Sequence, residues 1–229
     1  MMKQTIIVRI EISTLISSEG KINRRKMDRL AMVLTNLHNS GKHVMVVTSG
    51  AIVLGAEKLK LQTMPDNQLE MQAAASVGQA ELIRWYQHSF DEYNQIVAQV
   101  LLTSDIMHYP QRVKNTRNTF NRLLDMSIIP IINENDVVST ADIEFDDNYP
   151  LALMVAEIAM ADFIVIKMEM DDKYLIVPRG KRPALLVDGE TELQEKLESF
   201  CQVIVPDDKM EADQFPASIG EIVFKQLQS

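Results

Sequence analysis

Polar and small residues that could bind a charged ligand follow the apolar segment at 43–47. Thr48, Ser49, Gly50 and Ala51 come directly after it. Small residues at such a turn allow the backbone N–H groups at the start of a helix to approach an anion closely. An ordinary turn between a strand and a helix explains the same residues equally well.

A second polar group, residues 133–136, follows the apolar segment that begins at residue 128. Polar side chains directly after an apolar strand are costly to bury unless they are hydrogen-bonded or functional. An Asx-rich turn is the alternative interpretation. Asp146, Asp147 and Asn148 open the next predicted helix, where N-capping is also a sufficient explanation.

The first apolar segment, at 6–14, carries Arg9, Glu11 and Ser13 at every second position. Side chains in a β-strand alternate between its two faces, so we expect these three polar groups to share one face. That face is either exposed at the edge of a sheet or lines a binding site, and the residues alone do not decide which.

Neither metal nor thiol chemistry is indicated by the sequence. The four histidines have no metal-ligand spacing with one another or with Cys201, the only cysteine, so we expect no metal site. Cys201 lies in an apolar stretch and is interpreted as a small buried hydrophobic residue.

Short apolar segments alternate with segments of helical periodicity, which predicts a parallel sheet with helices on both faces. Asn23 is the expected N-cap of the first long helix, and Gly78 marks a break or a close helix contact in a later one. Ligands bind beyond the carboxyl ends of the strands in such sheets, where the candidate residues lie. The segment after residue 173 is interpreted as a shortened continuation of one domain spanning 1–229. The predicted strands after the first lie at 43–47, 95–102, 128–136 and 162–168.

The bulk composition excludes several classes of partner. The formal net charge is −9, from 32 acidic and 23 basic residues, which argues against binding to nucleic acid. The basic residues at 21–30 are interpreted as the solvated start of a helix. No apolar run approaches the roughly 18 residues that a membrane span needs. We therefore expect a cytoplasmic protein with no membrane contact.

An ordered set of segments resembles the glutamate 5-kinase branch of the amino acid kinase family. The resemblance extends over roughly residues 4–179. The segments that carry it are 21–55, MQAAASVGQAELI at 71–83, VAQVLLTSDI at 97–106, NTRNTFNRLL at 115–124 and IPIINENDVVST at 129–140.

This resemblance implies a three-layer αβα sandwich with a mostly parallel central sheet, shortened here at the C-terminus. It also implies ATP-dependent transfer of a phosphoryl group to the side-chain carboxylate of L-glutamate, a step of proline biosynthesis. Residues 1–160 would form the acceptor-substrate half and residues 161–229 a reduced nucleotide half, with no accessory RNA-binding-type domain.

The residues that the resemblance assigns to glutamate are all present. Ser and Asn side chains can donate hydrogen bonds to its carboxylates, and an Asp side chain can accept from its ammonium group. The small turn after the strand at 43–47 gives close backbone approach. Asp147 is retained at a catalytic position. The implied glutamate-binding residues are Ser49, Gly50, Ala51, Asp136 and Asn148.

The phosphate side departs from the family pattern. Arg9 stands at the position of a family lysine, and Glu11 replaces a glycine beside the phosphates. A carboxylate about 4 Å from a phosphate charge would repel it by about 4 kcal/mol at an effective dielectric of about 20, so Glu11 is predicted to obstruct the site. Met168 and Glu169 stand at nucleotide-contact positions, and residues 180–229 contain no counterpart of the family's Gly-Gly-Met-x-Thr-Lys segment.

Three hypotheses follow for the activity. One is a working glutamate 5-kinase that uses MgATP, with Lys167 or Lys181 replacing the missing lysine. The second is a non-catalytic pseudokinase that binds glutamate or a similar small acid in a regulatory role and needs no cofactor. The third is a structural partner of an active homologue. We expect impaired catalysis, weak or absent MgATP binding, measurable glutamate binding and a homo-oligomer, either a dimer or a tetramer.

Overall fold

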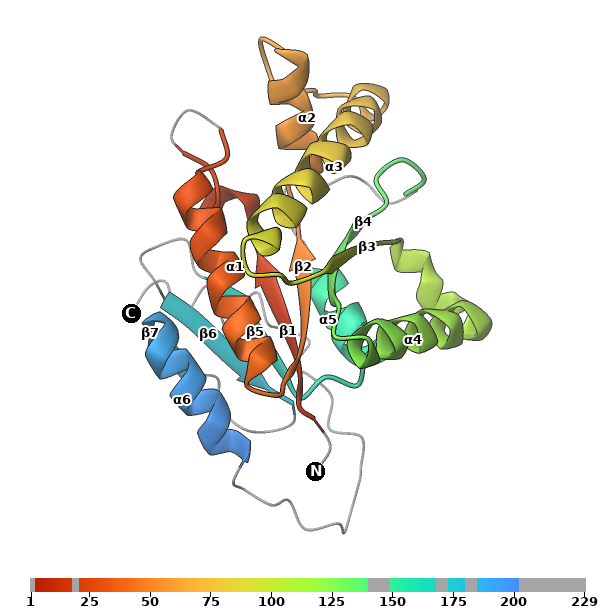
Figure 1. Ribbon diagram of the computed structural model, residues 1–229. Coiled ribbons are helices and arrows are strands. Elements are labelled where there is room, and N and C mark those ends of the chain that lie inside the picture. Colours follow the sequence, from red (N-terminus) through yellow and green to blue (C-terminus); the bar gives the residue numbers. More distant parts are fainter. Residues whose placement is uncertain (1–2, 18–20, 140–148, 168–172, 180–184, 202–229) are drawn as a thin grey trace.

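A seven-stranded sheet forms the centre of the molecule in the computed structural model, which describes residues 3–17, 21–139, 149–167, 173–179 and 185–201 (Figure 1). The strand order is β3-β4-β2-β1-β5-β6-β7, in which β3 to β5 are parallel while β6 and β7 are antiparallel to their neighbours. The strands are β1 (Thr5–Ile10), β2 (His43–Thr48), β3 (Val97–Leu102), β4 (Ile129–Glu134), β5 (Phe163–Lys167), β6 (Lys173–Pro178) and β7 (Leu185–Asp188).

Helices cover both faces of this sheet, as the alternation of segments predicted (Figure 1). α1, α3 and α6 pack on one face, and η2, α4 and α5 pack on the other, so the expected αβα layering is confirmed. The helices are η1 (Ile12–Thr14), α1 (Arg24–Asn39), α2 (Ala51–Leu59), α3 (Gln68–Asp91), η2 (Ser104–His108), α4 (Pro110–Asp125), α5 (Tyr149–Ile158) and α6 (Gly189–Cys201).

β1 is a central strand that lies between β2 and β5. Ile6, Val8 and Ile10 face the core under α1 and α3, whereas Ile7 faces the core on the α5 side. Apolar residues on both faces are typical of a parallel strand buried between two helical layers. The interpretation of this segment as a solvent-exposed edge strand is therefore excluded.

The first strand is shorter than its sequence pattern predicted. It ends at Ile10, and residues 12–14 form a single 3₁₀ turn. The Thr14 hydroxyl and backbone N–H both donate to the carbonyl oxygen of Glu11, at 2.6 and 3.1 Å, and these bonds turn the chain out of the sheet. Ser13 therefore lies in the turn and does not continue the alternation of the strand.

Asn23 caps α1 by accepting a hydrogen bond from the backbone N–H of Lys26 at 3.3 Å, as expected. α3 is continuous through Gly78, so the predicted break is absent and the alternative, a close helix contact, is confirmed. In the described part of the chain, no helix is both long and apolar enough to cross a membrane.

The contact between α2 and α3 is unusually close because both helices carry glycine there. A Cβ atom added at Gly78 would lie 1.7 Å from the carbonyl oxygen of Ala51, and one at Gly55 would lie 1.8 Å from that of Ala74. Only a residue without a side chain fits at either point. This crossing fixes the start of α2, which carries the first group of candidate residues.

Candidate functional site

The carboxyl ends of β1, β2 and β4 meet at one edge of the sheet (Figure 1). Ile10 pairs with Thr48 across β1 and β2, and Val47 pairs with Ile132 across β2 and β4. Residues that follow these three strands are thereby placed at the same edge. The three predicted groups of polar residues, around Glu11, Ser49 and Asp136, therefore follow the ends of three neighbouring strands.

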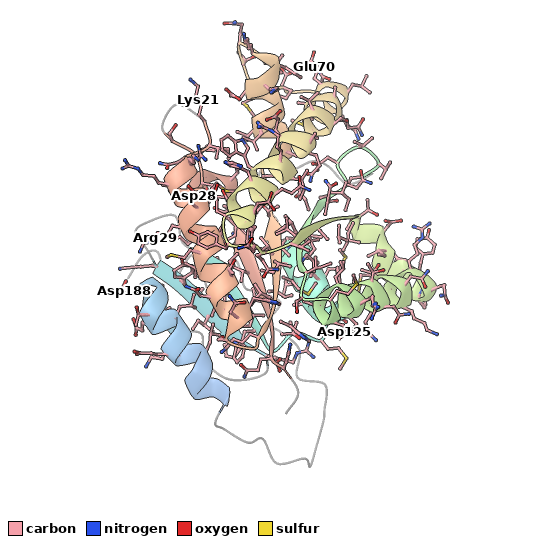
Figure 2. The ribbon with its side chains drawn as sticks, in the orientation of Figure 1. Lys21, Asp28, Arg29, Glu70, Asp125 and Asp188 are labelled. Atoms are coloured by element: carbon pink, nitrogen blue, oxygen red, sulfur yellow. The ribbon has the colours of Figure 1, made fainter. Side chains whose placement is uncertain are left out.

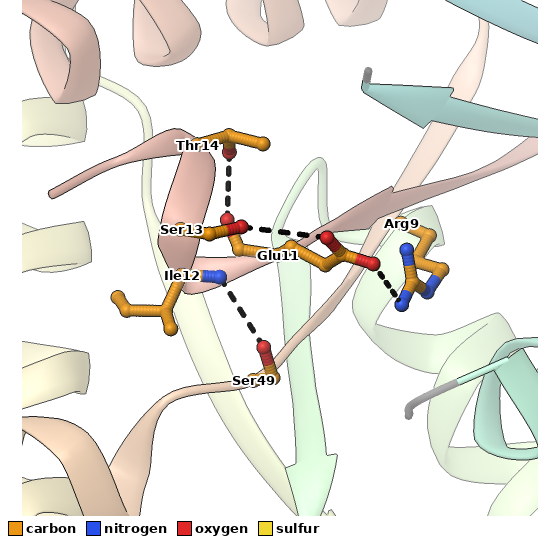
Figure 3. A network of polar contacts seen from close by, with 6 residues as sticks. All are labelled: Arg9, Glu11, Ile12, Ser13, Thr14 and Ser49. Carbon is orange, nitrogen blue, oxygen red and sulfur yellow. Dashed lines mark hydrogen bonds and ion pairs between the residues drawn. The ribbon is translucent and has the colours of Figure 1, made fainter. Parts of the chain in front are cut away.

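Ser49, which follows β2, is hydrogen-bonded to the turn that follows β1 (Figure 3). It is buried, with 5% of its surface exposed, and its Oγ accepts a hydrogen bond from the backbone N–H of Ile12 at 3.3 Å. A serine hydroxyl can both accept and donate hydrogen bonds. Ser49 is therefore held in place by the turn that follows β1.

Gly50 is the N-cap residue of α2 and has a left-handed backbone, φ +103°. A Cβ atom there would lie 2.4 Å from Cβ of Ile12, so both the backbone conformation and the packing require glycine. Ile12 fills the space beside the Gly50 Cα. A ligand would have to reach the first N–H groups of α2 from another side.

Thr48 and Tyr86 form a buried hydrogen bond behind this turn. The Tyr86 hydroxyl donates to Thr48 Oγ1 at 2.9 Å, and Thr48 Oγ1 donates to the carbonyl oxygen of Ser49 at 3.3 Å. Burial raises the pKa of the Tyr86 phenol above its ordinary value, so the phenol stays protonated as a donor. Sequence reasoning did not single out Tyr86. The one sequence feature that could have identified Tyr86 is its hydroxyl group, which lies in the otherwise apolar helical stripe formed by Leu82, Tyr86 and Phe90.

Arg9 and Glu11 form an ion pair at the end of β1 (Figure 3). Arg9 Nη2 lies 2.5 Å from Glu11 Oε1, and the guanidinium carbon lies 3.5 Å from the centre of the Tyr149 ring. Only 1% of the Arg9 side chain is exposed. Ser13 Oγ donates to the other Glu11 oxygen at 3.4 Å, so the three residues at alternate positions do come together.

This arrangement changes the interpretation of Glu11. The family resemblance predicted that the Glu11 carboxylate, a negative charge, would face a phosphate group. In the structure the carboxylate contacts the guanidinium of Arg9, and the two charges compensate each other. The cation that stands at the family lysine position is therefore already bound to an anion of the same chain.

Asp136 lies at a cavity of about 430 Å³ between α3, β3 and the loop after β4. Burial, together with the nearby carboxylate of Glu134, raises the pKa of Asp136 to about 6. Glu134 accepts a hydrogen bond from Ser139 Oγ at 2.9 Å. None of the described residues that line this cavity is Lys, Arg or His, which makes it suited to a cationic group of a ligand.

Amide side chains support the wall of this cavity. Asn133 Nδ2 donates to Gln79 Oε1 at 2.8 Å and so links the end of β4 to α3. Gln79 and Gln99 both line the cavity. These groups provide neutral donors and acceptors next to the two carboxylates.

Several predicted residues lie outside the described part of the chain. They are Asp147, Asn148, Met168, Glu169 and Lys181. Lys167 is described, at the end of β5, with its Nζ 4.6 Å from the centre of the Tyr174 ring. Ala51 is buried at the first position of α2. Across the described residues, no three His, Cys, Asp or Glu side chains are grouped as metal ligands.

Known proteins are similar to this chain both in sequence and in fold. The model of the amino acid kinase family matches residues 13–171. Glutamate 5-kinase of Enterococcus faecalis is 41% identical over 196 residues, which cover 84% of this chain and 72% of that protein. Glutamate 5-kinase of Listeria innocua is 39% identical over 200 residues, 86% and 72% of the two chains. The structure of Giardia carbamate kinase is similar in fold alone, with a TM-score of 0.52 at 14% identity over 72% of this chain and 73% of that one.

Proposed function

The chain belongs to the amino acid kinase family, and from that premise we propose that it is a glutamate 5-kinase-like protein with impaired phosphoryl transfer. In this proposal L-glutamate binds where β2 and β4 end, and its side-chain carboxylate is the phosphoryl acceptor. The proposal includes a cytoplasmic location and self-association as a dimer or tetramer.

The acceptor side supports glutamate binding through complementary charges. Ser49 donates to a carboxylate of the substrate, which approaches the N–H groups at Gly50 and Ala51 from the side that Ile12 does not occupy. Asp136 accepts from the ammonium group, in agreement with a cavity whose described lining residues carry no cation. Asn148, by its place in the family pattern, is proposed as a further donor.

One observation carries the proposal of impairment, the pairing of Arg9 with Glu11 at 2.5 Å. Phosphoryl transfer depends mainly on positioning and on neutralising charge at the phosphates. A cation that is 1% exposed, stacked on Tyr149 and paired with a carboxylate supplies no net charge for that purpose. The described residues at this strand end therefore do not fit the phosphates of MgATP.

Separate titrations of glutamate and MgATP by calorimetry test the proposal. We expect measurable glutamate binding, weak or absent MgATP binding, and little γ-glutamyl hydroxamate when both substrates are supplied with hydroxylamine. The enzyme from Enterococcus faecalis, assayed in parallel, provides the positive control. Micromolar affinity for MgATP together with hydroxamate formation would refute the impairment.

A non-catalytic pseudokinase is the second candidate, favoured by the same ion pair. It predicts glutamate binding with no hydroxamate at any MgATP concentration. A chain that binds neither ligand would instead support a structural partner of an active homologue. Co-purification of the chain with such a homologue, measured against each protein alone, separates these two outcomes.

A further inference from the structure

A second cavity, of about 410 Å³, lies between α2, α3 and residues 21–22. It shares no lining residue with the cavity beside Asp136. Lys21, on the segment that leads into α1, lies at the same end of the molecule as α2 (Figure 2). This cavity therefore belongs to a different part of the surface from the candidate glutamate site.

The residues that line this cavity carry a net positive charge, whereas the chain as a whole carries a net negative charge. Four basic side chains and two carboxylates line it, whereas the whole chain carries a net charge of −9. The basic residues are Lys21, Lys58, Lys60 and Arg84, and the acidic ones are Glu57 and Glu81. A local excess of positive charge on an acidic protein attracts anions to this place in particular.

Glu81 organises two of the cations. Lys58 Nζ lies 2.8 Å and Arg84 Nη2 lies 2.5 Å from its two carboxylate oxygens. These hydrogen bonds, the one from Lys58 first, lower the pKa of Glu81, so it remains charged and holds both partners. Because one carboxylate pairs with two cations, the side chains of Lys58, Glu81 and Arg84 together carry a net positive charge. Lys58 and Arg84 are more than half exposed, so a ligand can reach both.

An apolar wall stands beside these cations. Trp85 is the only tryptophan of the chain and packs partly buried against the core, next to Ile22 and Leu54. The Arg84 guanidinium lies 5.5 Å from the centre of the Trp85 ring. A flat aromatic surface next to basic side chains suits a ligand that has both a ring and an anionic group.

We propose that this cavity binds a small aromatic phosphate monoester, with the ring against Trp85 and the phosphate at Lys60, Lys21 and Arg84. Arginine and lysine are the side chains that most often bind phosphate oxygens in proteins. The proposal does not rest on the function proposed above, because none of the residues assigned to glutamate or MgATP lines the cavity.

Phenyl phosphate is a suitable probe, and Trp85 provides the signal because no other tryptophan contributes to the emission. Titration of the full chain should change the emission saturably, and calorimetry should give the same affinity. Phenol and inorganic phosphate, titrated separately, should each bind at least about tenfold more weakly, because each makes only one of the two contacts. Absence of a saturable change, or equal binding of inorganic phosphate, would overturn the proposal.

Two single variants test the cationic side of the cavity. Arg84→Gln and Lys60→Gln should each weaken phenyl phosphate binding at least about fivefold, through loss of a charged hydrogen bond. Lys114→Gln removes an exposed positive charge from α4, outside the cavity, and should leave the affinity unchanged. An equal loss in all three variants would identify a nonspecific charge effect and contradict the site. Glutamate binding should be the same in every variant, which separates this result from the test of the proposed function.

Discussion

Tyr86 of α3 donates a hydrogen bond of 2.9 Å to Thr48 at the last position of β2, although 38 residues separate them in the chain. Thr48 Oγ1 in turn donates a hydrogen bond to the carbonyl oxygen of Ser49. A helix that packs on one face of the sheet therefore supports the turn on which glutamate binding is proposed. The bond is fully buried, so no water can replace it at low cost.

Tyr86→Phe removes this donor without changing the shape of the ring. We expect the free energy of unfolding to fall by about 1 kcal/mol, because Thr48 loses a buried partner. We also expect weaker glutamate binding, since the position of Ser49 is less well fixed. Urea unfolding and calorimetry measure the two effects. Tyr93→Phe, at an exposed tyrosine near the end of the same helix, serves as the control and should change neither.

Gly78→Ala should separate α2 from α3. The added Cβ would lie 1.7 Å from the carbonyl oxygen of Ala51, and the backbone has to move because no flexible side chain is there to yield. We expect a loss of about 3 kcal/mol in the free energy of unfolding, at the upper end of what overpacking usually costs. Gln87→Ala, at an exposed position of α3, should stay within about 0.5 kcal/mol in the same urea titration.

The layered fold was predictable because each of its signals is local. Apolar segments, helical periodicity and the Asn23 cap are properties of neighbouring residues, and all of them are found in the structure. The end of the first strand was not predictable from alternation. The 3₁₀ turn depends on bonds to the Glu11 carbonyl oxygen, which any residue in that position would provide.

The site was predictable only as far as family resemblance identifies residues. Arg9, Glu11 and Ser13 were expected on one face of a strand, but the strand ends at Ile10. The direct pairing of Arg9 with Glu11 depends on how the turn after Ile10 directs the Glu11 side chain. The contacts of Tyr86 with Thr48 and of Arg9 with Tyr149 join distant segments. Only the packing of helices on the sheet selects such partners.

The pH dependence of glutamate binding should report on Asp136. Its pKa is raised to about 6, mainly by burial, so it becomes charged only as the pH rises through that value. An ammonium group binds the charged form, and we therefore expect glutamate affinity to increase between pH 5 and 7 by about tenfold. Asp136→Asn should abolish this pH dependence. Glu134→Gln, which removes the nearby negative charge, should move the transition to lower pH.

The same carboxyl group should also influence stability. Because its pKa in the folded state lies above the ordinary value of 3.8, the folded state binds the proton more tightly than the unfolded state. The contribution of Asp136 is therefore least unfavourable below pH 4, and it becomes more destabilising as the pH rises from about 4 to about 6, above which it stays constant. Asp136→Asn should stabilise the chain at pH 7 by about 3 kcal/mol and have little effect at pH 4, as measured by urea unfolding.

Glu11→Gln tests whether the ion pair stabilises the fold. The substitution keeps the size of the side chain and removes its charge, which leaves the Arg9 guanidinium buried without that carboxylate. We expect a loss of about 3 kcal/mol in the free energy of unfolding, the lower end for breaking a buried pair, because Glu11 is 19% exposed. Glu92→Gln, at an exposed position after α3, should have no measurable effect. A similar stability for Glu11→Gln and the parent chain would show that the pair contributes nothing.

The double variant Glu11→Gly with Arg9→Lys tests the explanation for impaired nucleotide binding. Together the substitutions restore the residue types of the family pattern, a compact ammonium group and a glycine that exposes its backbone. If the pairing of Arg9 with Glu11 is what withholds positive charge from the phosphates, MgATP should bind at least about tenfold more tightly, which corresponds to about 1.4 kcal/mol. Glutamate affinity should stay the same, because Ser49 and Asp136 are unchanged. Unimproved MgATP binding in a variant that folds and still binds glutamate would show that the defect lies elsewhere, with residues 180–229 the next segment to test.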